Sequence, residues 1–94
     1  MSDEQAMDTA SSEIWAPAPE VLRGFTDPAY RPPDKLDVRG ALKACGLTGV
    51  KAGELLGVDG RTIRRYTGGE RPLPYAMWRL LLIYGGYVNP PSRE

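Results

Sequence analysis

Residues 47–66 read LTGVKAGELLGVDGRTIRRY, a run that specifies two short helices joined by a tight turn. Thr48 is placed to begin a helix over Gly49–Leu56, and Asp59 is placed to begin a second helix over Gly60–Thr67. Both are residue types whose side-chain oxygen accepts a hydrogen bond from the free amides of a first helical turn. The run therefore predicts two consecutive short helices.

The turn between these helices has the residue types that a helix-turn-helix requires. Gly57 tolerates the positive φ angle of the turn, and Gly53 lets the two helices approach each other closely. We expect Val58 to plug the turn, and Ile63 and Tyr66 to anchor the second helix on the core. This spacing is typical of a motif whose second helix enters the major groove of DNA.

A further helix is predicted before the motif. Asp34 is a candidate N-cap, and Asp37 lies in the favourable negative position of the first turn. An apolar stripe follows at i, i+3, i+4 and i+7: Val38, Ala41, Leu42 and Cys45. Gly46 is placed to end this helix. Because Cys45 falls on the stripe, we expect a small buried hydrophobe there rather than a redox group.

The helix predicted after the motif, Tyr75–Tyr84, is apolar nearly all round, and Arg79 is its only charge. One face is expected to serve the core: Met77, Leu80, Leu81 and Tyr84. Trp78 and Leu82 then need another cover. They form either a two-fold homodimer interface, suited to a palindromic operator with half-sites roughly 34 Å apart, or a surface buried under the N-terminal arm.

The predicted fold is thus all-α, a small helix-turn-helix domain of about four helices with an irregular N-terminal arm. The sequence predicts a flexible, acidic, proline-containing arm over residues 1–33, a DNA-binding domain over residues 34–86 and a tail over residues 87–94. The apolar stretch Ile14–Phe25 is expected to dock on the domain or on a partner. Three of its side chains are candidate contacts for another protein: Trp15, Leu22 and Phe25.

Composition argues against an enzyme. The chain has 94 residues, no histidine and one cysteine. The commonest general base and commonest metal ligand are therefore missing, and neither an internal disulfide nor a zinc knuckle can form. We predict no catalytic residue, no metal site and no cofactor.

The charges are divided between the two halves of the chain. Residues 1–40 hold eight acidic and four basic residues, a net charge of −4, whereas residues 41–94 hold four acidic and eight basic residues, a net charge of +4. This division is typical of an acidic tail on a basic domain. No apolar run approaches the ~20 residues that span a bilayer, and the first residues do not resemble a signal peptide. We expect a cytoplasmic protein without a membrane partner.

The run over residues 47–66 resembles the phage-repressor-like (XRE-type) helix-turn-helix family. GERPLP at residues 69–74 is similar to the glycine-arginine-proline loop that often follows the reading helix in that family. Within it, the chain looks most like small anti-CRISPR-associated regulators. That likeness rests on DPAY at residues 27–30, the Leu-Leu-Gly turn, RRY at residues 64–66 and RPLPY at residues 71–75. The resemblance covers roughly residues 27–84.

The resemblance implies a role for several polar side chains. Four would read bases in the major groove, where arginine can donate two hydrogen bonds to guanine: Arg61, Thr62, Arg64 and Arg65. Three would contact phosphate: Thr48, Lys51 and Arg71. The implied function is that of a transcriptional regulator that binds double-stranded DNA at a specific sequence, a repressor encoded by a phage or mobile element. The alternative for the arginines is a solvated face on a small helix.

A second function class stays open at this point. A protein-binding inhibitor of a host defence system, similar to an anti-CRISPR, could reuse a helix-turn-helix fold. The zero net charge and the acidic leader favour it, as do two glycines: Gly49, where many relatives carry a glutamine, and Gly60, which removes a possible base-reading side chain. The arginine stripe favours DNA. A third hypothesis is a toxin–antitoxin domain that grips its toxin through Trp15 and Phe25.

Overall fold

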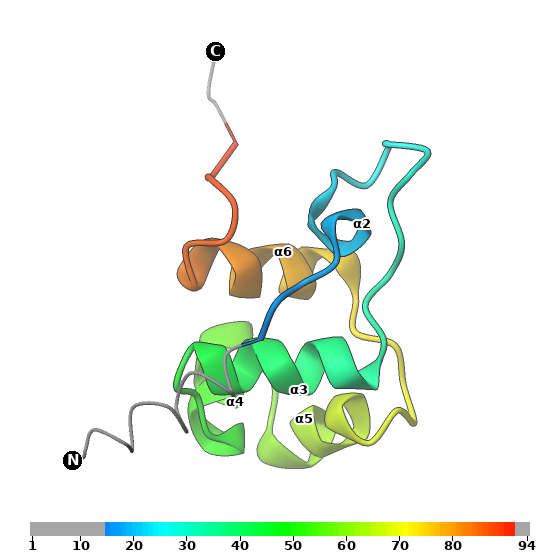
Figure 1. The fold of residues 1–94 in the computed structure, drawn as a ribbon. Helices are drawn as coiled ribbons and strands as arrows, with labels where there is room; N and C mark the ends of the chain where they lie inside the picture. The colour runs from blue at the N-terminus through cyan, green and yellow to red at the C-terminus, as the bar shows by residue number, and fades with distance from the viewer. Residues whose placement is uncertain (1–14, 92–94) are drawn as a thin grey trace, which may run out of the picture.

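The computed structural model describes residues 15–91, and every regular element in that part of the chain is a helix. The helices are α2 (Pro19–Leu22), α3 (Lys35–Ala44), α4 (Gly49–Leu56), α5 (Gly60–Thr67) and α6 (Tyr75–Tyr84) (Figure 1). The all-α fold and the four helices predicted from the sequence are confirmed. The single turn of α2 lies in the arm that was expected to be irregular.

The predicted start signals act as N-caps. The carboxylate of Asp34 accepts from the amide of Asp37 at 2.9 Å, and the carboxylate of Asp37 accepts from the amide of Asp34 at 3.1 Å, which completes a capping box. Thr48 accepts from the amide of Lys51 at 3.1 Å, and α4 begins at the next residue. Local hydrogen bonds therefore set where these helices begin.

The core gathers side chains from all described helices and from the loop before α6. Its buried members are Val21, Val38, Ala41, Leu42, Ala52, Leu56, Ile63, Tyr66, Leu73, Trp78, Leu81 and Leu82. Cys45 packs against this core, and its partial burial raises the pKa of the thiol. Cys45, expected to be a buried hydrophobe, is therefore only partly buried.

The face predicted for α6 is wrong in part, because Leu81 is buried and Met77 packs partly buried against the core as expected. Leu80 and Tyr84, expected in the core, are 40% and 54% exposed, whereas Trp78 and Leu82, expected outside it, have no exposed surface. The reason is the N-terminal arm, which supplies a cover that helical periodicity cannot reveal. Trp78 and Leu82 have no surface to offer a second copy, so the predicted dimer-interface residues are wrong, and for Trp78 the alternative, burial under the arm, is correct.

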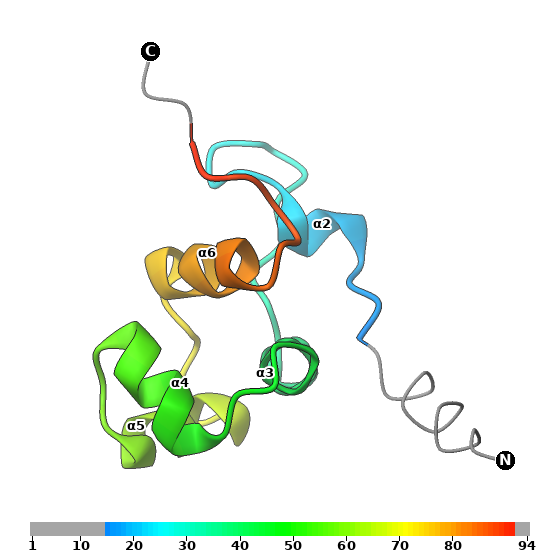
Figure 2. The ribbon, with the colours of Figure 1, turned by 90° about the vertical axis from the view of Figure 1, so that its left-hand side faces the viewer.

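The arm is joined to α6 by both packing and hydrogen bonds. The ring of Trp15 packs edge-on against the ring of Trp78, with a centroid separation of 5.5 Å. Arg79 donates to the carbonyl oxygens of Leu22 at 2.7 Å and Arg23 at 3.3 Å. Figure 2 shows α2 beside α6, on the side of the molecule away from α4 and α5. The described part of the arm therefore docks on the domain, which was one of the two alternatives expected from the sequence.

The other two side chains predicted to contact a protein partner, Leu22 and Phe25, differ in exposure. Leu22 is partly buried against the core, while Phe25 stays 65% exposed and lies against the rings of Tyr30 and Tyr75. Ile14, the first residue of the predicted docking stretch, lies outside the described residues. None of the helices between residues 15 and 91 is long and apolar enough to cross a bilayer.

Candidate DNA-binding surface

The turn between α4 and α5 depends on two glycines. The carbonyl oxygen of Gly53 accepts from the amides of Gly57 at 2.7 Å and Val58 at 3.0 Å. A β-carbon on Gly53 would collide with the carbonyl oxygen of Val58, so only glycine fits at this crossing. Gly57 has a φ angle of +79°, in the left-handed region that glycine adopts without strain. Both glycine predictions are confirmed.

The second helix of the motif is anchored on one side only. Ile63 and Tyr66 are buried, and α5 packs against both α3 and α4. Val58 is partly buried against the core at the turn, as expected for its plug. Asp59 caps α5 by accepting from the amide of Thr62 at 2.8 Å. The position of α5 is therefore set by its buried side, and its other side faces solvent.

The solvent side of α5 carries the arginines. Arg61 and Arg64 are exposed, and Arg65 and Thr62 are partly exposed. Within residues 15–91 no carboxylate forms a salt bridge with any of the three arginines. Asp59 is near enough that Arg61 and Arg65 help to lower the pKa of its carboxyl, after the larger effect of the hydrogen bond from Thr62. The four predicted base-reading residues thus lie together on one short helix.

The predicted phosphate residues of α4 are already engaged within the chain. The Thr48 oxygen accepts the capping hydrogen bond from Lys51, while its own hydroxyl proton stays available to donate. The ammonium group of Lys51 lies 3.8 Å from the carboxylate of Glu54, and both side chains are about two-thirds exposed. An exposed pair of this kind contributes little stability, so a phosphate can compete for the lysine.

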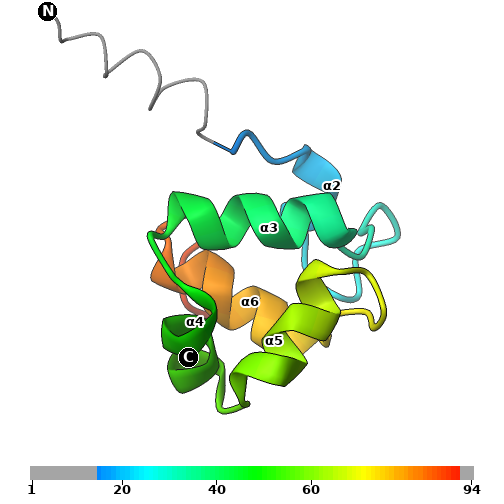
Figure 3. The same ribbon diagram turned by 90° about the horizontal axis from the view of Figure 1, so that it is seen from below.

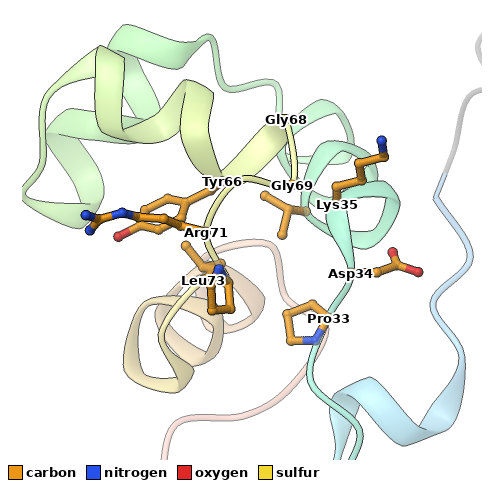
Figure 4. A pocket seen from close by; sticks show the side chains of 10 residues that line it. Pro33, Asp34, Lys35, Tyr66, Gly68, Gly69, Arg71 and Leu73 are labelled. Carbon is orange, nitrogen blue, oxygen red and sulfur yellow. The ribbon is translucent and has the colours of Figure 1, made fainter.

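Arg71 is placed beside the end of α5 by its backbone. The carbonyl oxygen of Arg65 accepts from the amides of Glu70 at 2.9 Å and Arg71 at 3.3 Å. The Arg71 side chain is exposed and lines a groove of about 430 Å³ between the start of α3 and the loop that follows α5. In Figure 4, Arg71 and Lys35 stand on opposite sides of this groove.

Two cationic residues beside α5 were missed from the sequence. Arg39 of α3 donates from Nε to the carbonyl oxygen of Thr67, the last residue of α5, at 2.7 Å. The aliphatic part of Lys35 packs over Gly69, where a β-carbon would lie 3.0 Å from the lysine Cδ. Their spacing of four residues places them on one side of a helix, which is the signal that could have found them.

Comparisons with known proteins point to transcriptional regulation. The chain is 47% identical over 57 residues to the transcriptional repressor protein KorC of Escherichia coli, a match that covers 57% of this chain and 67% of that protein. It is 39% identical over 57 residues to a second Escherichia coli KorC repressor, with the same shares covered. No protein-family model matches the chain. No solved structure matches it either.

Proposed function

Because this chain belongs to the KorC family of transcriptional repressors, we propose that it binds double-stranded DNA at a specific sequence and represses transcription. The observation that carries the proposal is the exposed arginine side of α5, held by the buried anchors Ile63 and Tyr66 in a helix-turn-helix. The chain needs no catalytic group for this function, and its place of action is the cytoplasm. Its origin in a phage or mobile element, and the likeness to XRE-type and anti-CRISPR-associated regulators, stay predictions.

The dimensions and chemistry of α5 suit the major groove. A helix with its side chains is about 10–12 Å in diameter, which the major groove, about 12 Å wide, accommodates. Arg61, Arg64 and Arg65 would reach base edges, and Thr62 would reach a base or a neighbouring phosphate. Thr48, Lys51 and Arg71 would bind the backbone on either side and set the register of the protein on the duplex.

We further propose that the repressor acts as a homodimer, through a different surface from the one predicted by sequence. The outward side of α6 carries Ala76, Leu80 and Tyr84, spaced four residues apart and all exposed. This side bears no charge, so two copies related by a two-fold axis meet without repulsion between like charges. A dimer would match a palindromic operator with half-sites roughly 34 Å apart.

The protein-binding inhibitor hypothesis loses much of its support. Trp15 and Leu22, two of its three proposed anchors, pack against the chain's own core, and only Phe25 is mostly exposed. An anchor that is already partly buried has less surface to contribute to an interface.

The deciding experiment is a binding titration with the DNA upstream of the protein's own gene. We expect binding to this duplex that is about 10³-fold or more tighter than to a scrambled duplex of equal length and composition, at one fixed salt concentration. Equal affinity for the two duplexes, or no binding to either, would overturn the proposal. Circular dichroism of the same sample establishes that the helices are formed.

A further inference from the structure

Some cationic side chains of the described residues pair with a carboxylate: Arg23 with Asp27 at 3.2 Å, Arg31 with Asp37 at 3.3 Å and Lys51 with Glu54 at 3.8 Å. Arg79 donates instead to the carbonyl oxygens of the arm. A second group, on or beside α5, forms no salt bridge with any carboxylate between residues 15 and 91: Lys35, Arg39, Arg61, Arg64, Arg65 and Arg71. The second group belongs to α3, α5 and the loop after α5.

Lys35 and Arg39 extend the basic surface beyond the helix-turn-helix. They are four residues apart, so they project from the same side of α3 at about 6 Å along its axis. Arg39 contacts the last residue of α5, Thr67, and Lys35 lies over Gly69 in the loop that follows. Figure 3, which views the molecule from below, shows α3 lying beside α5. A duplex seated on α5 would therefore bring its backbone close to this side of α3.

We propose that Lys35 and Arg39 bind backbone phosphates of the same duplex that α5 reads, an inference that rests on the proposed function. Lys35 supplies an exposed ammonium group, and no described carboxylate neutralises it. Arg39 uses only Nε on the Thr67 carbonyl, which leaves the donors of its two terminal nitrogens for a phosphate oxygen. The same guanidinium thus joins the end of the reading helix to the DNA backbone.

The partner is identified by charge and by continuity. Phosphate oxygens are the acceptors that lysine and arginine bind in duplex DNA, and such contacts set position without reading sequence. Lys35 and Arg39 also adjoin the chain directly at and after the end of α5, and residues 67–69, which they contact, carry no acidic side chain. Lys35 and Arg39 therefore add affinity and register to a site whose specificity resides in α5.

The test measures how affinity depends on salt. Each phosphate contact adds about 0.9 to the slope of log K against log salt. Lys35→Gln is expected to lower that slope by about 0.9 on both the upstream and the scrambled duplex, with the preference between them unchanged. When the salt concentration is raised from 50 to 200 mM, the fold-loss of affinity of Lys35→Gln relative to wild type should become about 3.5-fold smaller. Lys35→Gln together with Arg39→Gln should lower the slope by about two units.

Arg23→Gln is the matched control, because it removes one positive charge on the far side of the molecule, at the end of α2. It should leave the slope at the wild-type value. If Lys35→Gln has the same salt slope as wild type and still prefers the upstream duplex, this inference is overturned and the proposed function still stands. Absence of duplex binding by the wild type would overturn both. Loss of sequence preference in Arg39→Gln alone would make Arg39 a positioning residue and remove its phosphate role.

Discussion

The indole Nε1 of Trp78 donates a buried hydrogen bond of 2.8 Å to the carbonyl oxygen of Val21, 57 residues earlier in the chain. Both residues are fully buried. The bond ties the short helix of the arm to the last helix of the domain and satisfies two polar groups that would otherwise be buried without partners. The arm and the helix-turn-helix therefore share one core.

This bond predicts a large stability difference between two aromatic substitutions. Trp78→Phe removes the donor, leaves the Val21 carbonyl without its partner and opens a small cavity. The free energy of unfolding, measured in urea, should therefore fall by about 2–4 kcal/mol. Tyr75→Phe removes an exposed bond from the Phe25 amide and should change stability by less than about 0.5 kcal/mol. Equal losses of unfolding free energy in the two variants would show that the buried hydrogen bond stabilises the fold no more than the exposed one.

The crossing of α4 and α5 predicts opposite effects at two glycines of one helix. Gly53→Ala places a β-carbon against the Val58 carbonyl and should destabilise the fold by about 1–3 kcal/mol. Gly49→Ala meets open space and should be neutral or stabilising by up to about 1 kcal/mol. Thermal unfolding followed by circular dichroism compares the two. A stable Gly53→Ala variant would mean that the helices do not cross as described.

The exposed arginines predict a division between reading and positioning. Arg64→Ala should weaken binding to the upstream duplex by about 1–3 kcal/mol and relax preference at one base pair. Arg71→Ala should weaken all duplexes alike and reduce the salt slope by about one unit. Titrations against a set of single-base variants of the operator distinguish the two. Sequence-independent losses in both variants would exclude Arg64 as a base reader.

The outward side of α6 predicts the residues of the dimer. Leu80→Glu places a charge in each half of the proposed interface, and two such charges would meet across the two-fold axis, so the dimer should dissociate in sedimentation experiments. Leu36→Glu is the control, since Leu36 is 65% exposed and belongs to α3, outside the proposed interface. A wild-type protein that sediments as a monomer at micromolar concentration would contradict the homodimer.

The N-cap of α5 predicts a loss of stability in acid. The hydrogen bond from the Thr62 amide lowers the pKa of Asp59 below its usual value of 3.8. Because the folded pKa is below the unfolded one, ionised Asp59 stabilises the fold above pH 3.8, and this contribution is lost as the pH falls below that value. Asp59→Asn keeps a capping oxygen that does not titrate. Its melting temperature should therefore fall less than that of wild type between about pH 6 and about pH 3.

Local interactions explain why the helices of the motif could be placed from the sequence. Thr48 and Asp59 bond to amides three residues ahead, and Gly57 takes its positive φ angle within the turn itself. Gly53 was also predictable, because the residue it approaches, Val58, is only five positions away. Interactions of this range depend on residue types and spacing that one segment contains, so the sequence alone determined the boundaries of α4 and α5.

The tertiary structure decided which sides of these helices face the core and which side chains from distant segments meet. The sequence shows that α6 is apolar nearly all round, and so it does not distinguish Trp78 from Leu80. Trp78 is buried because Trp15 and Val21 return to cover it. In the same way, only the packing of α3 against α5 brings Arg39 to Thr67, 28 residues later. Burial and long-range hydrogen bonds depend on which segments lie side by side in space, and helical periodicity carries no information about that.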